Sequence, residues 1–159
     1  MILTGFKLPS LFAALYLVVL LAAGNLCLAS QAPETAGEIN FDRANVNYML
    51  NCQGCHGPEG VESLNGEIPR MKDYLGNFLK VVGGREYLVQ VPGSANAPLS
   101  DKDLAELLNW LLLTIAGHST PENYRPYSEA EVASVRRADN TNIAARRAEL
   151  VTSFEKLQN

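Results

Sequence analysis

A chain of 159 residues in which 47% are hydrophobic is long enough for one small globular domain with extensions. The formal net charge is −4, and this acidic balance makes nucleic acids and anionic membrane surfaces unfavourable partners. We therefore expect a single small core and a function that does not depend on binding polyanions.

An apolar segment opens the chain. Residues 8–23 are almost unbroken hydrocarbon and follow a single charge, Lys7, which is the layout of a secretory signal peptide. Cys27 and Ala29 suit the small-residue positions of a cleavage site. We therefore expect residues 1–29 to be a signal peptide and the mature protein to be exported to the periplasm.

An uncleaved membrane anchor is the rival interpretation, because residues 6–28 approach the ~20 residues that span a bilayer. A membrane partner is expected only in that case. Cleavage removes Lys7, which reduces the basic residues from 13 to 12 against 17 acidic ones and changes the charge from −4 to −5. It also removes Cys27, and the two cysteines that remain cannot build a disulfide framework.

The first helix of the mature chain follows a polar, flexible lead-in over residues 30–39. Asn40 or Asp42 can serve as its N-cap, and the predicted helix runs to about Gln53. Six glycines and prolines then break up residues 54–69, which predicts a loop.

Two shorter helical segments and one strong helix follow this loop. Gly83-Gly84 ends the first segment, and residues 85–90 favour a second. The strong helix begins at Ser100, where Ser-Asp-Lys-Asp supplies an N-cap and early acidic residues, and it ends at Gly117. Its apolar positions have helical spacing and predict a core face: Leu104, Leu107, Leu108, Leu111 and Ile115.

After Pro121 the chain becomes charged and rich in alanine. Residues 128–131 fit a capping box, and a last helix is predicted from an apolar stripe. We treat residues 118–159 as a helical C-terminal extension. Its stripe predicts either a docking helix for another protein or packing against the preceding domain. The stripe consists of Ile143, Leu150, Phe154 and Leu157.

The residues Cys52-Gln53-Gly54-Cys55-His56 form the C-x-x-C-H pattern of haem attachment. Two thiols about one helical turn apart can add to the two vinyl groups of one haem. The adjacent His56 is then placed to be the proximal iron ligand. The pattern predicts one covalent haem c, held by Cys52, Cys55 and His56.

A zinc half-site and a redox dithiol are the alternatives for this pattern. Zinc needs two more Cys or His ligands, and outside the motif the mature chain offers only His118. A thioredoxin-like dithiol follows a strand and opens a helix, whereas this pair ends one. Haem attachment is the favoured interpretation.

The motif and its surroundings resemble the class I c-type cytochromes. Residues 57–60, Gly-Pro-Glu-Gly, are similar to the Gly-Pro-Asp-Gly that often follows the haem histidine in bacterial members. Pro69 is similar in position to the family proline whose carbonyl accepts a hydrogen bond from the histidine ring. Residues 99–104 resemble the start of the family's C-terminal helix. The resemblance covers residues 40–117.

This resemblance implies an all-α, cytochrome c-like helical domain around one covalent haem, formed by residues 40–117. Its first and last helices are expected to cross beside the haem. Trp110 is expected either along the haem edge or in a purely structural role. The apolar faces implied for the crossing are Ala44, Tyr48 and Met49 against Leu104, Leu107, Leu108 and Leu111.

The sixth iron ligand departs from the family pattern. Many electron carriers have a Met-Pro pair at the place that Val91-Pro92 holds here, and valine cannot ligate iron. Met71 is the tentative distal ligand, because a thioether raises the reduction potential. Its place two residues after Pro69 instead resembles that of a family core leucine on the histidine side of the haem, and methionine is a good filler of such apolar gaps. His118 as ligand and an open distal face remain alternatives.

The resulting prediction is a periplasmic mono-haem cytochrome that transfers single electrons and is not itself an enzyme. It would be a soluble shuttle or the cytochrome partner of a periplasmic dehydrogenase or oxidase. The alternative is a haem protein with an open distal site that binds small ligands or has peroxidase-like activity. A third interpretation is an assembly protein that binds through its extension. Four cations either guide docking or are scattered charges: Arg70, Lys72, Lys80 and Arg85.

Overall fold

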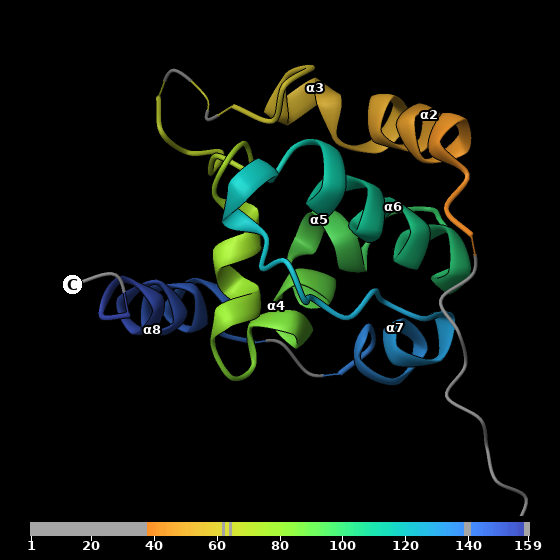
Figure 1. Cartoon of the computed structure of the whole chain (residues 1–159). Coiled ribbons are helices and arrows are strands. Elements are labelled where there is room, and N and C mark those ends of the chain that lie inside the picture. Colours follow the sequence, from red (N-terminus) through yellow and green to blue (C-terminus); the bar gives the residue numbers. More distant parts are fainter. Residues whose placement is uncertain (1–37, 62, 64, 139–140, 158–159) are drawn as a thin grey trace, which may run out of the picture. The chain divides into compact units, whose positions relative to one another are not determined.

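The protein folds into helices joined by loops, as a computed structural model shows (Figure 1). The structure describes residues 38–61, 63, 65–138 and 141–157, and no strand occurs in this part of the chain. The expectation of an all-α fold is confirmed. The elements are α2 (Phe41–Asn51), α3 (Gln53–His56), η1 (Leu75–Lys80), α4 (Gly84–Gln90), α5 (Pro92–Ala95), α6 (Asp101–Thr114), η2 (Gly117–Ser119), α7 (Glu129–Val135) and α8 (Ile143–Glu155).

The predicted signal peptide, residues 1–29, and the lead-in up to residue 37 lie outside the described residues. Among the helices that the structure does describe, none is long and apolar enough to cross a membrane.

Local capping chemistry sets where three helices begin. The side chain of Asn40 accepts a hydrogen bond from the amide of Arg43, so Asn40 rather than Asp42 caps α2. Ser100 caps α6 through the amide of Asp103, and Ser128 caps α7 through the amide of Glu131. The segment around residues 75–80 is a 3-10 helix, η1, rather than an α-helix.

The crossing of α2 and α6 is stabilised by an apolar cluster and by a buried acid. Glu106 is 7% exposed, and its carboxylate accepts hydrogen bonds from the Asn40 amide and the Arg43 guanidinium. These bonds tie the start of α2 to the middle of α6. The crossing cluster consists of Ala44, Tyr48, Met71, Leu107, Trp110, Leu111 and Ile115.

Two details of the predicted crossing are wrong. Met49 is 54% exposed, because Ala44 and Tyr48 lie one turn apart on the buried face of α2 and Met49 lies beside that face. Leu104 and Leu108 are buried, but they pack in a second cluster on another side of α6. Helix α6 is buried on nearly all sides, so its spacing alone cannot show which residues face α2.

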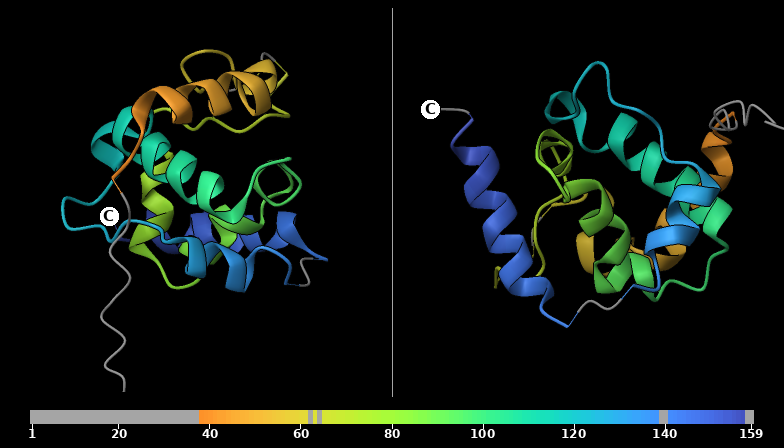
Figure 2. Two further views of the ribbon diagram at one scale, coloured as in Figure 1. Left: turned by 90° about the vertical axis from the view of Figure 1, so that its right-hand side faces the viewer. Right: turned by 90° about the horizontal axis from the view of Figure 1, so that it is seen from below.

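The C-terminal extension packs into this second cluster, here called the extension cluster. Figure 2 shows α6 lying between α2 and α7, and α8 lies against η1 and α4. Leu150 and Phe154 are at most 2% exposed, so these two residues of the predicted stripe pack in the core and are not available to dock another protein. Leu157, the last residue of the stripe, is 66% exposed. The buried members are Phe78, Tyr87, Leu88, Val89, Leu104, Ala105, Leu108, Leu112, Ala116, Tyr127, Val132, Leu150 and Phe154.

Polar contacts fix the register of the extension. The side chain of Asn109 donates to the carbonyl of Tyr127 at 2.9 Å and accepts from its amide at 2.7 Å, in the buried interior. The Arg85 guanidinium forms two hydrogen bonds with the Glu131 carboxylate and lies 4.1 Å from the centre of the Tyr127 ring. The extension is therefore joined to residues 85–109 by both apolar and charged contacts.

Glu131 should make the fold sensitive to acid. Burial raises the pKa of Glu131, but hydrogen bonds from Arg85 and Arg125 outweigh it, so the pKa lies below its ordinary value of 4.5. A carboxyl with a lowered folded-state pKa stabilises the fold above its unfolded-state pKa, and that stability is lost as the pH falls through the folded-state value. When the pH is lowered from about 6 to about 3, the free energy of unfolding should fall in both proteins. We expect the fall to be about 1 kcal/mol smaller in Glu131→Gln than in the wild type.

Urea unfolding at the two pH values measures this difference. Glu129→Gln is the control, because Glu129 is exposed in the first turn of the same helix. Equal pH dependence in Glu131→Gln and the wild type would contradict the assignment.

Candidate functional site

The two cysteines and the histidine of the motif lie together on one short turn where α2 ends. Cys52 breaks α2 with φ of −127°, and its carbonyl accepts hydrogen bonds from the amides of Cys55 and His56 at 3.1 and 3.0 Å. Gly57, at φ +68°, then ends α3, and its carbonyl accepts a hydrogen bond from the Tyr48 hydroxyl. The turn is thus fixed by its own backbone hydrogen bonds and by a hydrogen bond from the buried Tyr48 side chain.

The two thiols have different surroundings. Cys52 is half-buried against the crossing cluster, while Cys55 is exposed, and neither is in a disulfide. Burial, and secondarily the neighbouring Cys55, raises the pKa of Cys52 to about 11. The Cys52 thiol is therefore protonated at neutral pH.

The His56 imidazole is neutral at neutral pH. Burial lowers the pKa of His56, and the nearby carbonyl of Pro69 raises it by a smaller amount. The Nδ1 atom is buried and makes no hydrogen bond of normal geometry within the described structure. Buried polar atoms are nearly always paired, and the Pro69 carbonyl is the acceptor that lies near this ring.

A tight loop connects the motif to the end of α6. The carbonyl of Gly60 accepts hydrogen bonds from the amides of Met71 and Lys72, at 2.8 and 2.9 Å. Gly60 has φ +68°, and a Cβ atom there would lie 2.6 Å from Ile115. Only glycine fits this position, so the loop after the motif is fixed against the crossing cluster.

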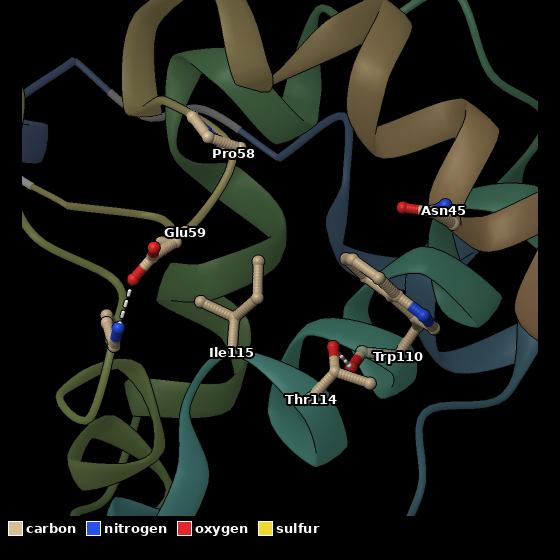
Figure 3. Close-up of a pocket in the computed structure, with 7 residues that line it drawn as sticks. Asn45, Pro58, Glu59, Trp110, Thr114 and Ile115 are labelled. Atoms are coloured by element: carbon tan, nitrogen blue, oxygen red, sulfur yellow. Dashed lines mark hydrogen bonds and ion pairs between the residues drawn. The ribbon is translucent and has the colours of Figure 1, made fainter.

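A pocket of about 420 Å³ lies next to this loop (Figure 3). In the figure Ile115 stands between Glu59 on one side and Trp110 on the other. None of the three motif residues lines the pocket, and its lining comes from separate segments, which is why sequence patterns did not indicate it. The lining residues are Asn45, Pro58, Glu59, Lys72, Trp110, Thr114 and Ile115.

The two other predicted ligand candidates have different surroundings. Met71 is 9% exposed and belongs to the crossing cluster, which Cys52 also contacts. The side chain of His118 is 87% exposed at η2 and lies 3.4 Å from the Asp73 carboxylate. The structure therefore brings Cys52, Cys55 and His56 together, places Met71 in the neighbouring core, and leaves His118 at the surface.

Comparison with known proteins found two relatives with about a quarter of their aligned residues identical to this chain. Both are named cytochrome c-552, and both come from Thermus thermophilus, one of them from a specified strain of that species. Each is 26% identical over an alignment of 109 positions, and the alignment covers 57% of this chain and 82% or 73% of the relative. The chain is distantly similar to c-type cytochromes. No family model and no solved structure matches it.

The four cations proposed for partner docking have separate surroundings. The Arg85 side chain is 20% exposed and is paired with Glu131, so it serves the fold. Lys72 is paired with Glu59, and Arg70 lies over the Tyr74 ring at 5.5 Å. Lys80 donates a hydrogen bond to a neighbouring side chain on η1. Arg85 is therefore not available as a docking cation.

Within the described part of the chain, no three His, Cys, Asp or Glu side chains are grouped so that they could hold a metal ion by themselves.

Proposed function

We propose that this protein is a mono-haem c-type cytochrome that transfers single electrons. The observation that carries the proposal is the turn at Cys52, Cys55 and His56, where two free thiols lie beside a half-buried imidazole that the Pro69 carbonyl approaches. The similarity to proteins named cytochrome c-552 supports the same assignment.

The residues of the turn suit this group. Cys52 and Cys55 would hold the haem through two thioether bonds, and the neutral His56 ring can offer a lone pair to iron. The carbonyl of Pro69 is placed to orient that ring, which is the outer contact that ligating histidines usually have. When bound, haem supplies an iron that exchanges one electron.

The chemistry of one thiol argues against Cys52 as the attacking cysteine of a disulfide oxidoreductase. A nucleophilic cysteine needs a lowered pKa, so that the thiolate is present at neutral pH. The pKa of Cys52 is raised to about 11, which keeps the thiol protonated. Each thiol would form its thioether bond by adding across a vinyl group of the haem, with the thiol proton passing to the second vinyl carbon.

A redox titration tests this function directly. The purified holoprotein should show a visible haem absorption that changes reversibly on reduction and fits the transfer of one electron. A protein that lacks this absorption would contradict the proposal. One that has the absorption but rapidly consumes peroxide would favour an enzyme instead.

The surroundings of Met71 favour a second candidate, a haem protein with an open distal site. Met71 lies in the crossing cluster among residues of α2 and α6. Residues 72–117 contain no methionine and no histidine, so the helices from η1 to α6 offer no common sixth ligand. Such a protein would bind small ligands such as carbon monoxide.

Replacing Met71 by alanine distinguishes the two candidates. If Met71 is core, the change should cost about 2 to 5 kcal/mol of unfolding free energy and leave the haem spectrum unchanged. If Met71 ligates iron, the change should abolish the thioether band, lower the potential and let carbon monoxide bind the reduced haem rapidly. The spectrum and the carbon monoxide rate measure this, and Met49→Ala is the control because Met49 is 54% exposed.

We also propose that the protein is exported to the periplasm and exchanges electrons with a dehydrogenase or oxidase there. The apolar segment at residues 8–23 supports export. N-terminal sequencing of the purified protein distinguishes cleavage before Ser30 from a retained anchor.

A further inference from the structure

A buried arginine of the extension holds the loop between α5 and α6. The Arg136 side chain is 6% exposed, yet its guanidinium is almost fully hydrogen-bonded. It forms an ion pair with the Asp101 carboxylate at 2.9 Å. It also donates to four carbonyls of one short segment: Ser94 at 3.4 Å, Ala95 at 3.2 Å, Ala97 at 2.6 Å and Leu99 at 2.8 Å.

Backbone hydrogen bonds hold the start of this segment to the preceding turn, because the amides of Ser94, Ala95 and Asn96 bond to carbonyls of residues 91 and 92. Farther along, the amide of Ala97 bonds to Ser94 at 3.4 Å, and that of Leu99 bonds to Ala97 at 2.8 Å. Carbonyls that converge on one point repel one another unless a cation with several donors occupies that point. The planar guanidinium with its five N–H groups can do this, whereas a lysine ammonium has three donors on a single atom.

The loop and the motif contribute residues to the same core cluster. Leu99, at the end of the loop, and Cys52 both pack against the crossing cluster. A group attached to Cys52 therefore borders the same cluster that Leu99 covers. The Arg136–Asp101 pair also fixes the first residue of α6, the helix that supplies Leu107, Trp110 and Leu111 to that cluster.

We propose that Arg136 is a positioning residue that holds residues 94–99 beside the haem, so that the C-terminal extension controls access of small ligands to the haem and its reduction potential. This inference rests on the proposed haem function. It assigns to residues 118–157 a role at the site in addition to their role in the core.

The neighbouring arginine provides a matched control. Arg137 bonds to the other oxygen of Asp101 at 3.2 Å, but its side chain is 74% exposed and no bond from it to the loop carbonyls is present among the described contacts. Arg136→Lys and Arg137→Lys thus make the same chemical change next to the same acid. Leu150→Ala is a second control, because it weakens the extension cluster from α8, the helix that contacts α4 and η1.

The test uses the full-length holoprotein and three measurements: amide hydrogen exchange of residues 94–99, the reduction potential, and the rate of carbon monoxide binding to the reduced protein. In Arg136→Lys we expect loop exchange to rise by about tenfold or more, as loss of hydrogen bonds to a charged group implies. We expect the carbon monoxide rate and the potential to change with it. Arg137→Lys should match the wild type in all three.

Leu150→Ala should lower stability without changing the potential or the carbon monoxide rate. If Arg136→Lys leaves both unchanged in a protein that carries haem, the inference is overturned and the proposed function stands. If Leu150→Ala changes them as much as Arg136→Lys does, the effect is general loosening and the inference is also overturned. A wild-type protein without haem overturns both.

Discussion

Replacing both Cys52 and Cys55 by alanine should give a protein that retains no haem after acid denaturation. The thioether bond forms when a thiol adds across a vinyl double bond, so an alanine side chain offers no atom that can form it. The chain has three cysteines, and the third, Cys27, lies in the predicted signal peptide. Haem staining of the denatured protein measures the effect.

Single replacements should leave one thioether bond each, with different side effects. Cys52 is half-buried and Cys55 is exposed, so Cys52→Ala should also reduce stability, whereas Cys55→Ala should change stability little. Cys27→Ala is the control and should leave the haem content unchanged. Haem that survives denaturation in the double variant would show that these cysteines do not hold it.

Replacing Phe154 by alanine should destabilise the whole domain by about 3 to 5 kcal/mol. Phe154 is 1% exposed, and its ring lies against Tyr74 and Phe78 at 5.6 and 5.3 Å between centroids. These rings meet edge to face, an arrangement that adds to the burial energy. The extension is therefore expected to unfold together with residues 40–117.

The control for this prediction belongs to the same predicted stripe but lies just after the end of α8. Leu157 is 66% exposed, so Leu157→Ala should change the unfolding free energy by less than about 0.5 kcal/mol. Urea unfolding measures both variants. A Phe154→Ala protein as stable as the wild type would mean that the extension is an appendage and not part of the core.

Features set by a few neighbouring residues could be predicted from the sequence. The caps at Asn40, Ser100 and Ser128 depend on side chains that bond three residues ahead, so their patterns are visible in the chain itself. The motif at Cys52 to His56 is local in the same sense, since one helical turn brings its three functional residues together.

Features that depend on residues far apart could not be predicted in this way. Glu106 and Arg136 look like ordinary surface charges in the sequence, yet both are only 7% exposed. Their partners lie more than 30 positions away along the chain, so the local sequence gives no sign of this burial. Apolar residues occur around most of α2, so its pattern could not show that Met49 faces outward. The position of Met71 likewise depends on how its loop folds back onto α6.

Mass analysis of one tryptic peptide tests the central proposal most directly. Cleavage after Arg43 and Arg70 gives the peptide Ala44–Arg70, which contains Cys52, Cys55 and His56 and no other lysine or arginine within it. After acid denaturation of the purified wild-type protein, we expect this peptide to carry the mass of one haem and to have no free thiol. The peptide at its unmodified mass, with two reactive thiols or a disulfide, would contradict the assignment of this chain as a c-type cytochrome.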